Sequence, residues 1–359
     1  MQNEIDFTVN APGRVFLFGE HSDYLGLEVI SAALDKRINF DVTIRDDTQI
    51  IINYLDLHKR DNFNFTEEIE YNHKRDYLRS AFNVLARKDI IPLSGAEITV
   101  FGDVPIAAGL SSSSALAVAS VMTIVELAKK SLDKREIANY AFEAEVLEFG
   151  ESGGMMDHLA SIFGGIIHVD FGDQIEITPL PSNLDGFVIG DSLEKKKDTV
   201  GDLRMIRDNV EMGYNTLRNK ISNFSHRETS IQTVLEHSNG LPNACKKMTE
   251  TTIRNRDLTR QALKILSNET PNPETIGKML DEHHKLMRDG LMRSTEKIEK
   301  MIQAAKEVGA LGGKINGSGG GGTMLAYAPG KEKEIAQALE KAGGVPYIIK
   351  ISEGAKLTY

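Results

Sequence analysis

The sequence predicts a mixed α+β fold in two domains, and three observations lead to this prediction. With 359 residues, the chain is long enough for two domains, because one domain usually holds about 100–200 residues. Strand-like and helix-like segments alternate through the first half of the chain. Beyond about residue 175 the chain is richly charged and mostly helical, until a final small αβ unit. We therefore expect domains at residues 1–180 and 181–359.

The first domain is expected to begin with strands and to continue with helices. β-Branched and aromatic residues interrupted by Gly and Asp predict strands at Phe7–Val9, Val15–Phe18, Ile38–Ile44 and Gln49–Tyr54. Apolar periodicity predicts helices at Leu78–Arg87, Ser113–Lys130, Lys134–Phe149 and Met155–Phe163, and strands at Ala96–Val100 and Ile166–Phe171. The segment Ser113–Lys130 contains no Gly or Pro and is rich in Ala and Val, so we expect a buried helix there.

The second domain is expected to be helical before it closes with an αβ unit. Its clearest helices are Ile276–Arg293 and Thr295–Val308. A strand–turn–strand unit, Ala310–Tyr327, surrounds a glycine cluster and is followed by a helix at Lys331–Lys341 and a strand at Val345–Ile351.

Composition and charge exclude several classes of protein. A hydrophobic content of 41% supports a packed core, and a formal net charge of −10 argues against a nucleic-acid partner. The only cysteine, Cys245, excludes an intramolecular disulfide and a thiolate metal site. The N-terminus lacks signal-peptide features, and no apolar run approaches the ~20 residues that span a membrane. We expect a cytoplasmic monomer or homodimer without a membrane partner.

The segment PIAAGLSSSSA, residues 105–115, predicts an anion site. It is a Gly/Ser loop that runs directly into a helix, where free backbone N–H groups and the helix dipole favour phosphate. It is not a Walker A loop, because no Gly-Lys-[Ser/Thr] follows the glycine. The alternative is a serine-rich N-cap, although one serine would suffice for capping.

Two further segments have the composition of ligand-binding loops. In APGRVFLFGEHSDY, residues 11–24, an apolar strand ends abruptly in acidic and imidazole side chains, which suit the recognition of vicinal hydroxyls; the alternative is a polar turn. In KINGSGGGGT, residues 314–323, the glycines would be entropically costly to order. A close approach of backbone to ligand would explain them, and a flexible hairpin is the alternative.

Two carboxylates near the predicted loop 150–154 are candidates for chemistry. Asp157 lies in an otherwise apolar helical stretch, and Glu145 lies in the helix before the loop. From the residues alone, Asp157 is a buried catalytic group, a charge at a helix N-terminus or a surface residue, and the three interpretations stay open.

In this order and spacing, the three segments resemble the signature motifs of the galactokinase–homoserine kinase–mevalonate kinase (GHMP) family, and the resemblance spans almost the whole chain. It implies an N-terminal mixed α+β domain and a ferredoxin-like α+β C-terminal domain, with the active site in the cleft between them. It also implies ATP and Mg²⁺ as cofactors and a small-molecule acceptor.

The resemblance also implies roles for individual residues. Asp157 would accept the proton of the acceptor hydroxyl, and Arg14 would keep Asp157 ionised and stabilise the transferring phosphoryl group. Ser113 and Glu145 would bind Mg²⁺. The residues implied in ATP binding are Pro105, Gly109, Leu110, Ser111, Ser112, Ser113, Ser114, Gly317, Gly319 and Gly320.

The first motif is most similar to that of galactokinases, in which residues matching Glu20, His21 and Asp23 bind sugar hydroxyls. The expected reaction is therefore phosphorylation of a sugar, with the anomeric 1-OH of galactose or a related sugar favoured. Several positions depart from the galactokinase pattern: Phe16, Phe18, Ser22, Leu25-Gly-Leu and His158. The glycine motif and the preceding Glu282-His-His look more like those of mevalonate kinases.

The alternatives are therefore a mevalonate-type alcohol kinase and a non-catalytic sugar and ATP sensor. The presence of Arg14, Ser113, Glu145 and Asp157 disfavours the sensor.

Two other sets of residues, a histidine pair and a lysine run, are expected to have no functional role. His283 and His284 lie in a charged helix and are expected at the surface, and Lys195–Lys197 is expected to be a solvated loop, with a lid over nucleotide phosphates as the alternative.

Overall fold

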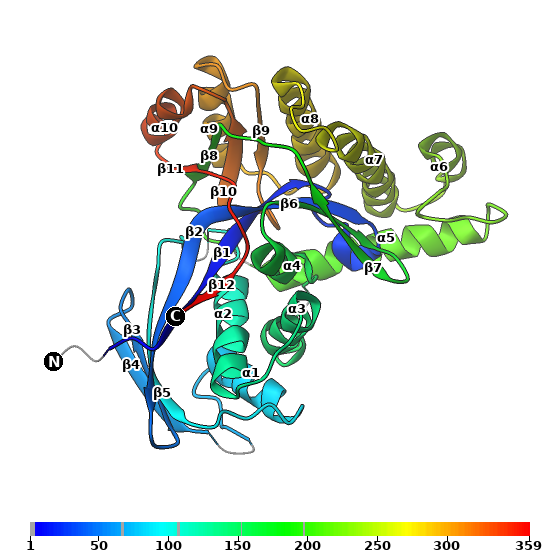
Figure 1. Ribbon diagram of the computed structural model, residues 1–359. Helices are drawn as coiled ribbons and strands as arrows, with labels where there is room; N and C mark the ends of the chain where they lie inside the picture. The colour runs from blue at the N-terminus through cyan, green and yellow to red at the C-terminus, as the bar shows by residue number, and fades with distance from the viewer. Residues whose placement is uncertain (1–3, 66–67, 106–107, 152, 197) are drawn as a thin grey trace.

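Two sheets divide the chain into two layered units, one above the other in Figure 1. The computed structural model describes residues 4–65, 68–105, 108–151, 153–196 and 198–359. Within these residues, no helix is long and apolar enough to cross a bilayer.

The larger sheet has eight strands in the order β12-β1-β2-β5-β3-β4, with β6 paired to β2 and β7 paired to β6. Its strands are β1 (Phe7–Phe18), β2 (Glu28–Arg45), β3 (Gln49–Tyr54), β4 (Lys59–Asn64), β5 (Gly95–Gly102), β6 (Ile166–Phe171), β7 (Ile175–Leu180) and β12 (Lys356–Thr358). The ladder between β1 and β2 shifts register between Pro12 and Arg14. Such a bulge redirects a side chain, and it lies next to the arginine of the first motif.

Helices cover one face of this sheet (Figure 1). They are α1 (Tyr77–Ala86), α2 (Ser112–Leu127), α3 (Lys134–Phe142) and α4 (Met156–Phe163). Helix α2 is almost entirely buried because its Ala and Val residues pack on every side. A π-helical turn, Glu143–Leu147, continues α3; π-turns are rare and frequent at functional sites.

The smaller sheet confirms the ferredoxin-like expectation. Its strands β8 (Phe187–Asp191), β9 (Gly312–Ile315), β10 (Thr323–Tyr327) and β11 (Val345–Ile349) pair antiparallel in the order β11-β8-β10-β9. Helices α9 (Glu296–Glu307) and α10 (Glu332–Lys341) pack on it. The β-α-β-β-α-β order with this strand arrangement is that of the split βαβ fold.

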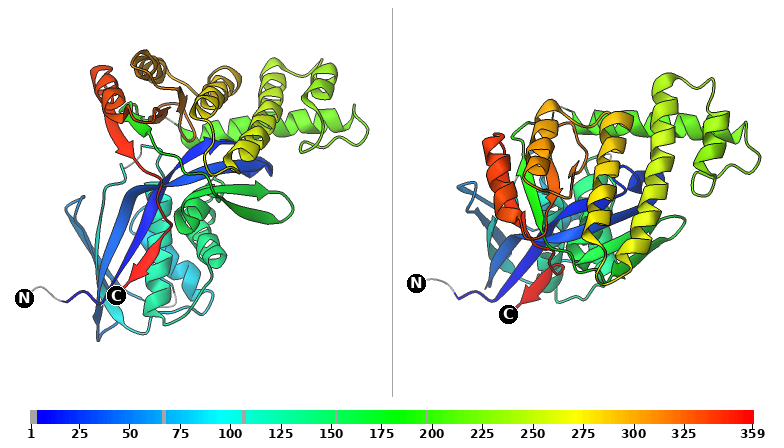
Figure 2. Two further views of the ribbon diagram at one scale, coloured as in Figure 1. Left: turned by 45° about the horizontal axis from the view of Figure 1, so that its top comes forward. Right: turned by 90° about the horizontal axis from the view of Figure 1, so that it is seen from above.

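A helical segment is inserted between β8 and α9. It comprises α5 (Thr199–Arg218), α6 (Ile231–His237), α7 (Asn243–Leu266) and α8 (Pro273–Lys285), the last extended by a π-helical turn, Leu286–Gly290. Helix α7 packs on β1 and β2 of the larger sheet. Figure 2 shows α5 reaching past that sheet toward the short helix α6.

The two units share a hydrophobic core. Val15, Leu17 and Phe18 of β1 belong to the same buried cluster as Leu280 of α8 and Leu325 of β10. The chain also ends in the larger sheet, where Thr358 pairs with Thr8. The domain boundary at residue 180 stays a prediction. The last strand, β12, nevertheless belongs to the larger sheet of the first unit.

Most expected elements are present with small shifts of their ends. The larger differences are in strands, whose extent depends on the strands they pair with. The two strands expected at Phe7–Val9 and Val15–Phe18 form one continuous strand, β1, and β2 begins ten residues before the expected Ile38. Strands β4, β7, β8 and β12 were not expected. The sequence of β4, KRDNFN, is polar, and its strand conformation depends on pairing with β3.

Candidate active site

The three motifs meet at the carbonyl oxygen of Gly109. This oxygen accepts one hydrogen bond from Arg14 Nη1 at 2.8 Å and another from Asn316 Nδ2 at 3.0 Å. Asn316 in turn accepts from the backbone N–H of Phe16 at 3.1 Å. The strand end, the serine loop and the glycine loop are thereby fixed to one another, although 300 residues separate Phe16 from Asn316.

Arg14 and Asp157 form a two-pronged ion pair next to this junction. Arg14 Nε and Nη2 each donate to a different Asp157 oxygen at 2.7 Å. The guanidinium also lies 4.3 Å from the centre of the Phe16 ring, a cation–π contact that fixes its plane. Burial would raise the pKa of Asp157, but Arg14 and Ser111 outweigh it and lower the pKa below its ordinary value.

The serine loop leaves the start of α2 free for an anion. Ser111 occupies the N-cap position with φ of 60°, and its side chain makes no capping hydrogen bond. Its hydroxyl instead donates to Asp157 at 2.5 Å. The N-cap alternative for this serine is therefore wrong. The first amides of α2 keep the anion-binding character of an uncapped helix N-terminus.

Lys196 enters the junction between the serine and glycine loops. Its Nζ donates to Ser318 Oγ at 2.9 Å. A Cβ atom on Gly109 would lie 3.1 Å from this nitrogen and one on Gly322 would lie 3.5 Å from it, so the two glycines make room for the ammonium group. Burial and the neighbouring Arg14 lower the pKa of Lys196 to about 8.

The expectation that Lys195–Lys197 is a solvated loop is thus wrong for Lys196. Lys195 is exposed, as expected, and Lys197 lies outside the described residues. No local signal marks Lys196 among three consecutive lysines, because its burial depends on loops more than 80 residues away in either direction along the chain.

Asp23 and His21 line the other side of the junction. The Asp23 carboxylate lies against Gly154, where any Cβ atom would overlap with it. Burial and the negative charge of Asp157 raise the pKa of Asp23 to about 6. Burial and nearby cations lower the pKa of His21 to about 3, and its Nδ1 lies 2.8 Å from the hydroxyl of Tyr24.

Glu20 is engaged by the protein itself. Its Oε1 pairs with Lys314 Nζ and accepts from the N–H of Gly317 at 3.3 Å, while Oε2 lies 3.3 Å from His283 Nδ1. Glu20 and Lys314 are both 1% exposed or less. Burial raises the pKa of Glu20 and lowers that of Lys314. Contact between Glu20 and an acceptor stays a prediction, and these partners leave its carboxylate little freedom.

The expectation that His283 and His284 lie at the surface is wrong. They are 0% and 4% exposed, and burial lowers the pKa of both. The apolar periodicity of α8 is a signal that could have found His283, because it follows Ile276 by seven residues and Leu280 by three. The burial of His283 follows from its position on the apolar face of α8, although the helix as a whole is rich in charged residues.

The Glu145 carboxylate fits a magnesium site that also uses nucleotide phosphates. Glu145 is buried, and its Oε2 lies 2.7 Å from His158 Nε2 without the alignment of a hydrogen bond. Within the described residues, no group of three or more His, Cys, Asp or Glu side chains could hold a metal ion alone. Mg²⁺ commonly binds through one or two side-chain oxygens, phosphates and water. Glu145 lines one pocket with Ser114, and the other implied ligand, Ser113, lines the adjoining pocket, so the pairing of Ser113 with Glu145 at one ion stays a prediction.

Two adjoining pockets collect these side chains. The motif pocket is lined by all three sugar-binding candidates, Glu20, His21 and Asp23, and also by Glu145, Ser114 and Gly317. The serine pocket contains Ser111, Ser112 and Ser113. Both are lined by five shared residues, which make the two pockets continuous: Arg14, Arg75, Gly109, Asp157 and Lys196.

Four of the residues implied in ATP binding do not line these pockets. Pro105 lies before the loop, and the side chain of Leu110 packs in the core shared by the two sheets. Gly319 lies against the backbone of Arg293, and the N–H of Gly320 donates to the Arg293 carbonyl at 2.7 Å. Their contact with ATP stays a prediction, and their observed role is to build the loop.

Comparisons with known families agree with this arrangement. Residues 76–165 match the family described as "GHMP kinases N terminal domain", and residues 261–345 match "GHMP kinases C terminal". Residues 1–42 match the "Galactokinase galactose-binding signature". The matched ranges contain the serine loop, the glycine loop and the first motif respectively.

Individual relatives divide between two activities. The chain is 32% identical to a mevalonate kinase of Pyrococcus furiosus, over 97% of each chain. It is 30% identical to a galactokinase of Haemophilus influenzae, over 99% of this chain and 96% of the other. A solved structure of Lactococcus lactis galactokinase with galactose shares the fold, with a TM-score of 0.84, 20% identity, and coverage of 98% of this chain and 94% of that one. The motifs, the fold and these relatives together show that the chain belongs to the GHMP kinase family and is a phosphotransferase.

Proposed function

We propose that this chain is an ATP- and Mg²⁺-dependent sugar kinase that transfers the γ-phosphoryl group to a sugar hydroxyl, with the anomeric 1-OH of galactose or a related sugar favoured. The observation that carries the proposal is the ionised Asp157, held by Arg14 and Ser111, in one pocket with Asp23. The proposed base, the phosphate loop and a carboxylate that can accept hydrogen bonds from sugar hydroxyls then lie together.

In the proposed reaction, the acceptor oxygen forms a bond to the γ-phosphorus while the bond to the β–γ bridging oxygen breaks and ADP leaves. Asp157 takes the proton of the acceptor hydroxyl. An aspartate beside arginine is a weak base, so positioning and electrostatics supply much of the rate. Arg14 and Lys196 offset charge on the transferred group. Mg²⁺ held by Glu145 and Ser113 would neutralise phosphate charge.

The charges in the motif pocket favour a neutral polyhydroxy acceptor over a hydroxy acid. Of the cations that line it, Arg14 pairs with Asp157 and Arg75 pairs with Glu151. Lys196 lies between the two loops assigned to phosphate. Asp23 forms no ion pair within the described part of the chain. Sugar hydroxyls can donate to this carboxylate, whereas an acceptor carboxylate beside it would be repelled.

A mevalonate-type alcohol kinase is the second candidate. Two observations favour it: the 32% identity to the Pyrococcus furiosus mevalonate kinase, and the buried pairing of Lys314 with Glu20. That pairing occupies one carboxylate that the resemblance to galactokinases implies for sugar.

The test is a coupled ADP-release assay with Mg-ATP, run in parallel on galactose, other hexoses, amino sugars, uronic acids and mevalonate. The expected result is turnover of a neutral hexose, with NMR of the product showing phosphate at the anomeric position. Turnover of mevalonate alone would replace the proposal by the second candidate. Silence with every acceptor, while ATP still binds, would reject both the sugar kinase and the mevalonate-type candidate, and would favour an acceptor outside this panel or a sensor.

A further inference from the structure

A third pocket lies beside the motif pocket on the far side of Tyr24. It is lined by Tyr24 at the end of the first motif and by the following Leu25, by Tyr214 and Arg218 of α5, and by His226 from the segment between α5 and α6. We name it the α5 pocket. Helix α5 connects the two pockets, because its Leu203 lines the motif pocket and Tyr214 lies eleven residues further on, about 16 Å at 1.5 Å per residue.

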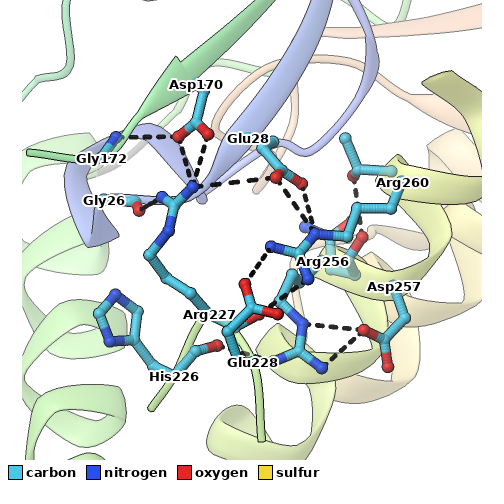
Figure 3. A network of polar contacts seen from close by, with 12 residues as sticks. Gly26, Glu28, Asp170, Gly172, His226, Arg227, Glu228, Arg256, Asp257 and Arg260 are labelled. Carbon is cyan, nitrogen blue, oxygen red and sulfur yellow. Dashed lines mark hydrogen bonds and ion pairs between the residues drawn. The ribbon is translucent and has the colours of Figure 1, made fainter. Parts of the chain in front are cut away.

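The His226 wall of this pocket is fixed by three arginines (Figure 3). Arg256 Nη1 donates to the His226 carbonyl at 2.8 Å, and Arg260 Nη1 donates to the Arg227 carbonyl at 2.8 Å. The Arg227 side chain donates to the carbonyl of Gly26 at 2.6 Å. A surface segment held at successive carbonyls is preorganised, which lowers the entropic cost of binding a ligand to it.

The same network ties the segment to the larger sheet. Arg227 Nη2 pairs with Asp170 of β6 at 2.5 Å, and Arg260 Nε pairs with Glu28 of β2 at 2.9 Å. Figure 3 shows the His226 imidazole lying apart from these contacts. Within the described residues its ring nitrogens form no hydrogen bond, although the ring packs on Tyr214 with centroids 5.1 Å apart. The network thus fixes the backbone of the segment, while the ring nitrogens of His226 stay available for hydrogen bonds to a ligand.

Within the described residues, the α5 pocket is lined by one arginine that has no counter-charge of its own, and by unpaired polar groups. Arg218 is exposed and forms no ion pair in the described part of the chain; its Nη1 donates to Asn215 at 2.7 Å. The pocket's one carboxylate, Glu211, is paired with Arg207 at 2.8 Å. Burial and the nearby arginines lower the pKa of His226. The buried Tyr214 hydroxyl has no hydrogen-bond partner among the residues that the structure describes.

The composition of the pocket indicates one ligand chemistry. Arginine with a neighbouring imidazole and amide suits a phosphate or a similar anion. Aromatic faces with a few placed polar groups suit a small, partly apolar ring. A ligand that uses both is a hydroxylated phosphate monoester, with its phosphate at Arg218 and its ring against the half-buried Tyr24.

Tyr24 connects this pocket to the motif pocket. Its side chain lines both pockets, and its hydroxyl lies 2.8 Å from His21 Nδ1. A ligand that moves Tyr24 would therefore move His21 and the adjacent Asp23, which are the groups assigned to the acceptor.

We propose that the α5 pocket is a second ligand site for a sugar phosphate, and that its occupation changes the affinity of the motif pocket for the acceptor through Tyr24. The effect on the acceptor rests on the proposed function, whereas binding to the α5 pocket does not.

The test is calorimetric titration of the full chain with glucose 6-phosphate, in the presence of excess Mg²⁺ and a non-hydrolysable ATP analogue to occupy the phosphate loops. Glucose and inorganic phosphate are titrated separately. Arg218→Ala removes the anion-binding group, and Arg204→Ala is the matched control, because it removes the same exposed side chain from the same helix outside every described pocket.

Binding of the ester is expected to weaken about tenfold or more in Arg218→Ala, the scale of a lost hydrogen bond to a charged group, and to be unchanged in Arg204→Ala. Equal affinity in all three proteins, or no binding to the wild type, would overturn the proposal. Phosphate alone binding as tightly as the ester would overturn the assignment to a sugar phosphate.

A kinetic measurement separates this proposal from the proposed function. Once an acceptor is identified, saturating glucose 6-phosphate is expected to shift the acceptor KM in the wild type and not in Arg218→Ala. An unchanged wild-type KM would refute the coupling through Tyr24. Ester binding that depends on Arg218, in a protein that releases no ADP with any acceptor, would reject the proposed function and leave the second site standing.

Discussion

The substitution Asp157→Asn tests the proposed base with little change in shape. Asp157 accepts hydrogen bonds from Arg14 at 2.7 Å on each oxygen and from Ser111 at 2.5 Å. Asparagine replaces one acceptor oxygen by an NH₂ donor and removes the charge. Arg14 then loses its counter-charge, and one of these contacts places a donor against a donor.

The expected loss has a catalytic and a structural part. Removing a general base costs about 10²–10⁴-fold in kcat, which corresponds to about 2.7–5.4 kcal/mol in the activation barrier. Breaking a buried ion pair on one side destabilises a protein by about 3–5 kcal/mol. The Asp157 side chain is 25% exposed, so water can solvate the unpaired Arg14, and we expect the lower end of that range.

A matched control separates the two parts. Asp61 pairs with Arg79 outside the described pockets at 2.5 Å, with side-chain exposures of 25% and 3%, against 25% and 7% for Asp157 and Arg14. Arg79 keeps a second counter-charge in Asp76 at 2.9 Å, so the loss of stability is expected to be smaller in Asp61→Asn. We expect Asp61→Asn to lower the thermal midpoint while kcat stays near the wild-type value, and Asp157→Asn to lower kcat at least a hundredfold with ATP binding intact by calorimetry.

The assay is ADP release at saturating Mg-ATP and acceptor, with each variant checked by thermal unfolding. A folded Asp157→Asn protein with kcat within about threefold of the wild type would refute the base assignment. An equal loss of kcat in Asp61→Asn would show that stability, and not chemistry, explains the effect.

Three further predictions follow from the charges of the site. Asp23 faces Asp157 and has a pKa of about 6, so it is protonated below that pH. We expect kcat/KM for the acceptor to fall as the pH drops below 6 in the wild type and not in Asp23→Asn, and a flat wild-type profile would contradict this. Lys196→Met is expected to raise the KM for ATP or lower kcat at least tenfold, because it removes a charge-assisted contact to phosphate, and unchanged steady-state constants would return Lys196 to a structural role. Glu20→Gln leaves the Lys314 ammonium buried without a counter-charge and is expected to cost about 3–5 kcal/mol of stability, measured by denaturant unfolding; a rise in acceptor KM alone, with unchanged stability, would instead support direct contact with the acceptor.

Features that depend on short stretches of chain could be predicted from the sequence. The serine loop before α2 was expected because a glycine and successive serines before an apolar helix have local consequences for backbone and hydrogen bonding. Helices α2, α4 and α9 were placed to within a few residues for the same reason. Apolar residues recur at helical spacing in α4 and α9, and α2 is a long Ala- and Val-rich segment without Gly or Pro. The proximity of Arg14 to Asp157 was expected only through the family resemblance, because 143 residues separate them.

Features that depend on distant partners could not be predicted in this way. Strand β12 is a strand because β1 offers it an open edge, and its three residues carry no pattern of their own. The fully buried Lys314 and His283 lie where charge alone suggests a surface. Their burial is tolerable because Glu20 lies next to both.

The sequence by itself determined the family, the motifs and the class of chemistry, because these depend on residue types in local order. Only the tertiary structure decided that Lys196 lies between the serine loop and the glycine loop and that Glu20 is engaged by Lys314. It also decided that Tyr24 separates two pockets. The physical reason is that a charged side chain is buried only where a partner from elsewhere in the fold offsets its desolvation, and the position of that partner is a property of the fold.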